Sequence, residues 1–207
     1  RMPFDSLRAR TLNEEIFKKI KEDSVEQTKV LGIKKGEAPD MKGTGKRNAH
    51  LLAIAPNANS SMITGCSPSI EPHKANAYTH RTRAGSHLIK NRYLREELIK
   101  LNMDTPEVWT SIITNGGSVQ HLDFINDSIK EVFKTAIEID QRVIIEQGGD
   151  RQKYLCQGQS LNIFFPAGAS KNYLHDVHMK AWKHECKGLY YLRTETSHRA
   201  ENVAEKV

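Results

Sequence analysis

The chain has 207 residues, of which 38% are hydrophobic and 27% are charged. These values are typical of a soluble globular protein, and no apolar run approaches the ~20 residues that a membrane-spanning helix needs. The formal net charge of +6 is spread among acidic residues, which favours attraction to phosphates over binding to nucleic acid. No secretory signal opens the sequence, so we expect a cytoplasmic protein without membrane contact.

The first half of the chain predicts a helix, a loop and a strand. Residues 11–31 carry apolar side chains at helical spacing, and Gly32 is expected to end that helix. Residues 36–46 are rich in Gly and include Pro39, which predicts an exposed loop. The apolar run 50–55, stopped by a proline, predicts a strand buried on both faces, as in a parallel sheet.

The second half continues the alternation of helices and strands. Thr105 and Pro106 predict the start of a helix over 105–113, which Asn115 and two glycines then break. Helices are also expected over 88–101, 128–147 and 172–187, and strands over 160–165 and 189–193. Alternating helices and short apolar strands indicate an α/β fold.

The three cysteines are odd in number and far apart, which argues for a reducing compartment rather than a disulfide framework. None has the paired spacing of a metal site, and His175 and His178 share a helical face without a second pair. We therefore expect no metal or other cofactor bound by this chain. The thiols are those of Cys66, Cys156 and Cys186. Flanking lysines could lower the pKa of the last thiol, and an ordinary helix residue is the alternative.

Small polar residues follow the predicted strand that ends at Pro56. Hydroxyl groups and free backbone amides just beyond a buried strand can converge on a phosphate, which makes residues 57–65 a candidate phosphate site. The alternative is a capping turn in which Asn59 or Ser60 accepts a hydrogen bond from the next helix. The sequence leaves both readings open.

Two adjacent tyrosines, Tyr190 and Tyr191, stand in the last predicted strand. Neighbouring side chains of a strand point to opposite faces, so one core ring and one boundary ring are the structural alternative. A phenol with a pKa of ~10 can give up an electron at neutral pH only if its proton leaves too. Stacked rings whose hydroxyls share a hydrogen bond meet that need, and a bulge at Gly188 could permit such stacking.

Several short segments, taken in order, resemble a known family. They are RNAHLLAIAP at 47–56, SS at 60–61, SIEP at 69–72, NGGSVQ at 115–120, QGQSLN at 157–162, AW at 181–182 and GLYYLRT at 188–194. Together they look like the C-terminal third of the large (alpha) subunit of aerobic, class I ribonucleotide reductase, in a phage-like form. The resemblance runs from roughly residue 11 to residue 195.

The resemblance implies the C-terminal part of the family's ten-stranded α/β barrel, where a cysteine radical reduces the ribose of a nucleoside diphosphate for DNA precursor synthesis. Residues 1–45 would form a helix and loop leading into the barrel, and residues 46–207 would belong to the barrel domain, which is incomplete alone. By position in the motif, the substrate's phosphates would be held by Asn57, Ala58, Asn59 and Ser60.

The resemblance also implies a role for the tyrosines. Tyr190 and Tyr191 would be the last relay pair through which the radical of a metal-containing small (beta) subunit reaches the active-site cysteine. Thioredoxin or glutaredoxin would act through parts of the family's large subunit that this sequence lacks.

The family's radical cysteine, flanked by Asn and Glu, is missing here, as are the cysteine pair that supplies electrons and the pair on its mobile tail. The sequence begins at Arg1, so we expect a fragment or one piece of a naturally split subunit. Such a chain would need the N-terminal piece of the large subunit for activity. Unpaired sheet edges of a divided barrel would drive that association.

Two other functions remain as alternatives. A cobalamin-dependent reductase shares the proline loop and the segment Glu71-Pro72 but needs no relay from a small subunit, and so gives no reason for the tyrosine pair. A noncatalytic basic binding module would bind nucleic acid in a salt-sensitive way.

Overall fold

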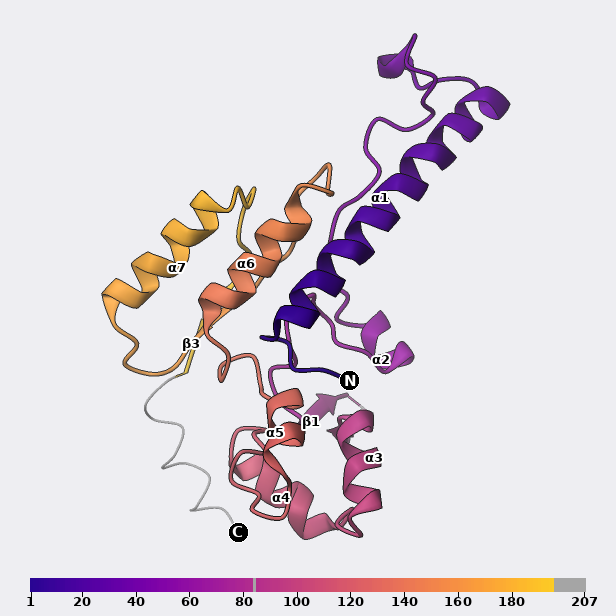
Figure 1. Ribbon diagram of the computed structural model, residues 1–207. Helices are drawn as coiled ribbons and strands as arrows, with labels where there is room; N and C mark the ends of the chain where they lie inside the picture. The colour runs from indigo at the N-terminus through magenta and orange to yellow at the C-terminus, as the bar shows by residue number, and fades with distance from the viewer. Residues whose placement is uncertain (84, 196–207) are drawn as a thin grey trace. The chain divides into compact units, whose positions relative to one another are not determined.

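The computed structural model describes residues 1–83 and 85–195 of the chain, drawn in Figure 1. The described chain forms two compact units, and each is treated by itself. Unit 1 joins Arg1–Ser6 to Asn57–Asp140, and unit 2 joins Leu7–Pro56 to the described residues from Gln141 on. No helix among these residues is long and apolar enough to cross a membrane.

Helix α1 (Leu7–Lys35) confirms the predicted first helix, but it does not end at Gly32. A side chain at Gly32 would collide with the carbonyl group of Gly45, so this glycine serves close packing inside the helix. The helix ends at Lys35, before Gly36 with φ +80°. The expected loop over 36–46 is confirmed, with a short 3₁₀ turn η1 (Pro39–Met41).

The prediction of a buried strand over 50–55 is wrong. Ile54 forms only an isolated parallel bridge with Gln159, and residues 50–55 are partly or fully exposed. The bridge consists of the amide of Ile54 donating to Gly158 (3.2 Å) and the amide of Ser160 donating to Ile54 (2.9 Å). An apolar run becomes a buried strand only where neighbouring strands pair with it, and the described residues provide this one bridge.

Unit 1 contains a β-hairpin that the sequence reading missed. Strands β1 (Ala77–Thr82) and β2 (Gly85–Lys90) pair antiparallel, so the helix expected over 88–101 is wrong in its first turn. Helix α3 (Arg92–Lys100) begins only after Asn91, whose side-chain oxygen accepts hydrogen bonds from the amides of Tyr93 and Leu94.

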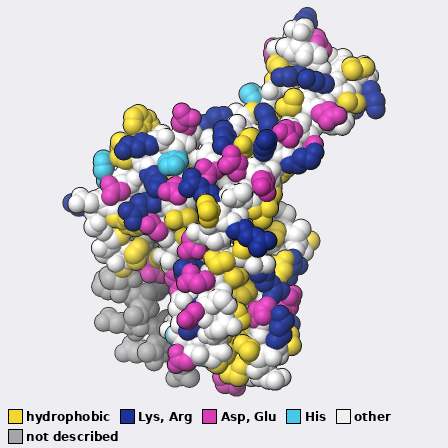
Figure 2. All heavy atoms as spheres, in the orientation of Figure 1, with side chains coloured by type: hydrophobic (Ala, Val, Ile, Leu, Met, Phe, Trp, Pro, Cys, Tyr) yellow, Lys and Arg dark blue, Asp and Glu magenta, His cyan; other side chains and the backbone are white. Residues whose placement is uncertain are grey.

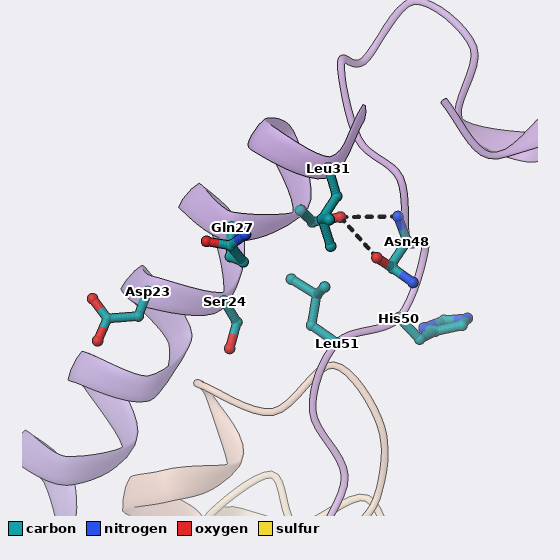
Figure 3. Close-up of a pocket in the computed structure, with 8 residues that line it drawn as sticks. Asp23, Ser24, Gln27, Leu31, Asn48, His50 and Leu51 are labelled. Carbon is teal, nitrogen blue, oxygen red and sulfur yellow. Dashed lines mark hydrogen bonds between the residues drawn. The ribbon is translucent and has the colours of Figure 1, made fainter. Parts of the chain in front are cut away.

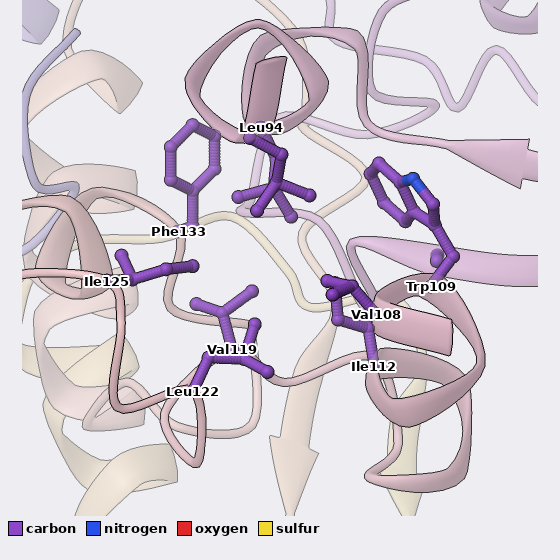
Figure 4. Packing of buried hydrophobic residues seen from close by; sticks show 10 residues of the cluster. Leu94, Val108, Trp109, Ile112, Val119, Leu122, Ile125 and Phe133 are labelled. Atoms are coloured by element: carbon purple, nitrogen blue, oxygen red, sulfur yellow. The ribbon is translucent and has the colours of Figure 1, made fainter. Parts of the chain in front are cut away.

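Another helix of unit 1 confirms the start that the sequence predicted. Helix α4 (Pro106–Thr114) has Pro106 in its first turn, and the Thr105 hydroxyl accepts a hydrogen bond from the amide of Val108. Two short helices complete the unit, α2 (Ser60–Thr64) and α5 (Asp127–Val132). The core of unit 1 is an apolar cluster shown in Figure 4, with Leu94, Trp109, Ile112 and Val119 fully buried.

The long helix expected over 128–147 is wrong, because α5 and α6 (Gln141–Gln152) are separate helices. Between them, the amide of Ala136 donates to the carbonyl of His73 (2.9 Å). The Glu138 carboxylate accepts hydrogen bonds from the amide (2.7 Å) and hydroxyl (2.9 Å) of Thr135. The amides of Thr135 and Ala136, which a continuous helix would pair internally, are thus bonded elsewhere, so the amphipathic pattern is divided between two helices.

In unit 2, helix α6 packs against both α1 and α7 (Lys171–Lys183), and Figure 1 shows the three helices side by side. Strand β3 (Ile163–Phe165) is fully buried and confirms the apolar part of the run 160–165. It pairs parallel with β4 (Leu192–Thr194), which starts later than the predicted strand over 189–193. Helix α7 ends before 187, the predicted last residue, and Glu185 takes a left-handed backbone with φ 56°.

Candidate functional site

The predicted phosphate loop lies in unit 1, between Pro56 and helix α2. The amide of Asn57 donates to the carbonyl of Pro68 (2.8 Å), and the carbonyl of Asn57 accepts from the amide of Ser61 (3.0 Å). The loop residues Asn57, Ala58, Asn59 and Ser60 are exposed, whereas the Ser61 side chain is buried. The loop is therefore fixed at both ends and open between them.

The capping alternative is not found at Asn59. This residue occupies the N-cap position of α2, but its side chain makes no capping hydrogen bond. The buried hydroxyl of Ser61 instead donates to the carbonyl of Ala58 (3.0 Å), a role that the sequence did not reveal. Among the described residues, the amides of Ala58, Asn59 and Ser60 make no backbone hydrogen bond. These donors are thus available to a ligand.

The tyrosine pair lies in unit 2, just before β4, and its two rings touch. The ring centroids are 4.0 Å apart at an interplanar angle of 50°, and the Tyr190 hydroxyl donates to the Tyr191 hydroxyl over 3.3 Å. Both residues are about half exposed, at 47% and 50%. The alternative of one core ring and one boundary ring is therefore wrong, and the shared hydrogen bond that coupled transfer requires is present.

Irregular pairing with the segment before β3 places both rings together. The amide of Tyr190 donates to the carbonyl of Leu161 (2.8 Å), and the carbonyl of Tyr191 accepts from Ile163 (2.9 Å). The amide of Tyr191 donates to the side-chain oxygen of Asn162 (3.2 Å) instead of to a strand carbonyl. This side-chain contact interrupts the regular ladder, so the rings are freed from strand alternation. Gly188, where a bulge was expected, has no left-handed backbone.

The hydroxyl contact also sets the electrostatics of the pair. Its hydrogen bond to Tyr191, together with the charge that Tyr191 would carry when ionised, raises the pKa of Tyr190 above its ordinary value. Arg193 acts in the opposite direction on that pKa, and its guanidinium carbon lies 4.9 Å from the centroid of the Tyr191 ring. Tyr190 therefore keeps its proton at neutral pH.

The cysteines lie in three different environments. Burial raises the pKa of the Cys186 thiol, so the expectation that nearby lysines lower it is wrong. Burial also acts to raise the pKa of Cys156, but hydrogen bonds from the amides of Leu52 and Leu51 and the charge of Lys21 lower it overall. Over residues 1–83 and 85–195, no three His, Cys, Asp or Glu side chains are grouped as metal ligands would be.

A groove of about 530 Å³ in unit 2 contains none of the predicted site residues (Figure 3). It lies between α1 and residues 48–51, where the Thr28 hydroxyl accepts from the amide of Asn48 (2.9 Å) and donates to its side-chain oxygen (3.3 Å). The groove is lined by Asp23, Ser24, Gln27, Thr28, Leu31, Asn48, His50 and Leu51.

Comparison with known proteins agrees with the resemblance seen in the sequence. The family model "Ribonucleotide reductase, barrel domain" matches residues 38–192. The chain is 58% identical over 194 residues to a protein of Frog virus 3 (isolate Goorha) named as a ribonucleoside-diphosphate reductase large subunit, covering 94% of this chain and 34% of that protein. It is 45% identical over 206 residues to the large subunit of Invertebrate iridescent virus 6, covering 97% and 22% of the two chains.

Among solved structures, the class Id ribonucleotide reductase alpha subunit of Actinobacillus ureae matches with a TM-score of 0.86 and 39% identity, over 94% of this chain and 36% of that one. The chain thus spans about a third or less of the length of these relatives. It belongs to the ribonucleotide reductase family, as a mixed α/β part of the class I large-subunit barrel domain.

Proposed function

We propose that this chain is the part of a ribonucleoside-diphosphate reductase large subunit that relays a radical and binds the substrate's phosphates. The observation that carries the proposal is the contact of Tyr190 with Tyr191, whose rings lie 4.0 Å apart and whose hydroxyls share a hydrogen bond of 3.3 Å. The chain acts within a large subunit whose remaining part supplies the radical cysteine. We retain residues 46–207 as its share of the barrel domain.

The tyrosine pair can exchange a hydrogen atom without creating charge. When one ring is a phenoxyl radical and the other a phenol, the O–H bond of the phenol breaks and a new O–H bond forms on the first ring. The proton and one electron cross together, so the radical moves by one ring and both residues stay neutral. The raised pKa of Tyr190 supports this route, because loss of the proton alone is disfavoured at neutral pH.

The radical would enter the pair from a metal-containing small subunit and leave it toward a cysteine outside this sequence. The small subunit is thus the one-electron oxidant, and the chain itself contributes tyrosines rather than a cofactor. A reductant of the thioredoxin or glutaredoxin kind would restore the cysteines that are oxidised when a ribonucleotide is reduced. The tyrosine contact favours this system over a cobalamin-dependent reductase, which has no use for a relay from a small subunit.

The loop of unit 1 supports phosphate binding independently of the tyrosines. Its exposed amides at Ala58, Asn59 and Ser60 and the Ser60 hydroxyl are neutral donors, which suit the terminal phosphates of a nucleoside diphosphate. A noncatalytic basic module is less well supported, since Figure 2 shows Lys and Arg side chains interspersed with Asp and Glu on the visible face.

The relay is tested by removing one hydroxyl at a time in the complete large subunit, assembled with its small subunit. Tyr190→Phe and Tyr191→Phe should each reduce diphosphate reduction to background, because phenylalanine carries no transferable hydrogen. Tyr78→Phe, at an exposed tyrosine of strand β1, is the matched control and should keep full activity. Activity retained in both relay variants would refute the assignment.

The phosphate loop is tested separately with Ser60→Ala. Loss of a hydrogen bond to a charged phosphate should raise KM for the diphosphate about tenfold or more, with a smaller change in kcat. Ser128→Ala is the control, because Ser128 is exposed and its hydroxyl donates a hydrogen bond to the side chain of its neighbour Asn126 (2.8 Å). An unchanged KM in Ser60→Ala would remove this hydroxyl from the site and leave the backbone amides as the remaining donors.

A further inference from the structure

Arg193 lies two residues beyond the tyrosine pair, and its side chain reaches back over one of the rings. Its guanidinium carbon is 4.9 Å from the centroid of the Tyr191 ring, within the distance at which a cation is attracted to an aromatic face. Strand β4 fixes its backbone, because Arg193 stands opposite Phe164 in the parallel pairing with β3. The contact therefore joins a charge on a paired strand to an exposed ring.

We propose that Arg193 is a positioning residue of the radical relay, which holds the Tyr191 ring against Tyr190 and opposes loss of an electron from Tyr191 without its proton. The inference rests on the relay function proposed above and adds to it a residue outside the tyrosine pair. Arg193 acts through Tyr191 and takes no part in bond making itself.

The first part of this role is geometric. The two rings are 47% and 50% exposed, so packing alone leaves them free to rotate toward solvent. Transfer between them depends on the 3.3 Å separation of their hydroxyls, which any such rotation would lengthen. A planar guanidinium over the face of the Tyr191 ring favours the orientation in which the two rings meet. Because it contacts the ring face, it leaves the hydrogen bond between the two hydroxyls intact.

The second part of the role is electrostatic. If an electron left Tyr191 without its proton, the ring would become a cation next to the guanidinium, and repulsion would oppose that step. At Tyr190 the charge of Arg193 acts the other way, because it lowers the pKa of that phenol. The hydrogen bond to Tyr191 outweighs it and keeps the pKa of Tyr190 raised, so loss of the proton first is also disfavoured. The route that remains moves a neutral hydrogen atom between the rings.

The test uses Arg193→Gln, Arg193→Lys and the control Arg83→Gln in the complete large subunit with its small subunit. Arg83 is exposed in the turn between β1 and β2. The phenol pKa values are measured by carbon NMR of labelled tyrosines, and kcat and KM for the diphosphate are measured in parallel.

We expect Arg193→Gln to lower kcat about tenfold with KM unchanged, because substrate binding is untouched. It should also raise the pKa of Tyr190 further, since the opposing charge is gone. Arg193→Lys keeps the charge, so it should preserve the tyrosine titration and recover part of kcat. Arg83→Gln should match the wild type in both measurements.

Two results would overturn the role of Arg193 while leaving the relay intact. One is full activity of Arg193→Gln in a protein where Tyr190→Phe and Tyr191→Phe are inactive. The other is an equal loss of kcat in Arg193→Gln and Arg193→Lys with unchanged tyrosine titration, which would show a merely structural contact. Full activity of both tyrosine variants would instead refute the relay itself.

Discussion

The interiors of the two units are built from different chemistry. The core of unit 1 is a cluster of apolar side chains around Trp109 and Ile112, both fully buried. Unit 2 also buries apolar strand and helix residues, but long polar side chains lie among them. These polar residues are Gln141, Gln147, Arg151, Gln152, Gln159 and Asn162.

The two kinds of interior hold neighbouring segments in place in different ways. Unit 1 also buries Asn76, which donates to the carbonyls of Gly117 (3.1 Å) and Phe133 (2.7 Å), but the cluster at its core is apolar and fills volume without direction. Hydrogen bonds are directional, and in unit 2 they fix the strand next to the tyrosines. Gln141 accepts from the amide of Phe164 (2.8 Å), and Asn162 accepts from the amide of Tyr191 (3.2 Å). The buried polar groups thus position the tyrosine pair.

The comparison of the two interiors can be tested by substitution, and we expect the largest loss of stability from Trp109→Ala. The substitution empties the centre of the unit 1 core and removes the hydrogen bond from the indole to Asp104 (2.7 Å), so local stability should fall by about 3–5 kcal/mol. Hydrogen exchange of the amides of α3 and α4 measures the loss unit by unit. Trp182→Ala, at a tryptophan that is 72% exposed, should change exchange by less than about 0.5 kcal/mol. Equal effects of the two changes would contradict a core centred on Trp109.

A smaller effect is expected from Gln159→Leu in unit 2. Its side chain accepts from Arg151 (2.7 Å) and donates to the carbonyl of Gly148 (2.8 Å) and to Gln152 (3.0 Å). Leucine fills similar space but leaves these buried groups without that partner, which should cost about 1–3 kcal/mol. Faster exchange at the amides of Tyr190 and Ile163 would report the loss.

The control for this change is Gln157→Leu, whose side chain is exposed two residues away. It should leave the exchange of those amides within about 0.5 kcal/mol of the wild type. If Gln159→Leu proved no more costly than Gln157→Leu, polar contacts would not be what holds the strand beside the tyrosines, and the contrast between the units would fail.

Features that depend on residues adjacent in the sequence were predictable. Thr105 and Pro106 mark the start of α4, and the apolar residues of β3 mark a buried strand. The pattern over 128–147 misled because helical spacing continues across a stretch whose backbone bonds instead with His73 and within Thr135 to Glu138. The run 50–55 misled because hydrophobicity does not say whether a neighbouring strand is present.

The candidate site divides in the same way. The sequence singled out Tyr190 and Tyr191 and the loop at 57–60 as chemistry-bearing residues, and their roles stay predictions. Ring contact, the Asn162 hydrogen bond and the cation over Tyr191 were beyond its reach, because each depends on how β4 and the residues before it pair with β3 and its preceding segment. Ser61 was overlooked because only the structure shows that it is buried and that its hydroxyl donates to the carbonyl of Ala58.

By itself, the sequence determined the long first helix, the exposed loop that follows it, the capped start of α4 and the family, because caps, periodicity and ordered motifs depend on residues close together in the chain. The tertiary structure decided where the amphipathic run divides, which apolar segment becomes a strand, and that adjacent tyrosines face each other rather than opposite sides. The reason is that these outcomes depend on which distant backbone groups form hydrogen bonds with each segment. The local pattern of hydrophobic and polar residues does not identify those partners.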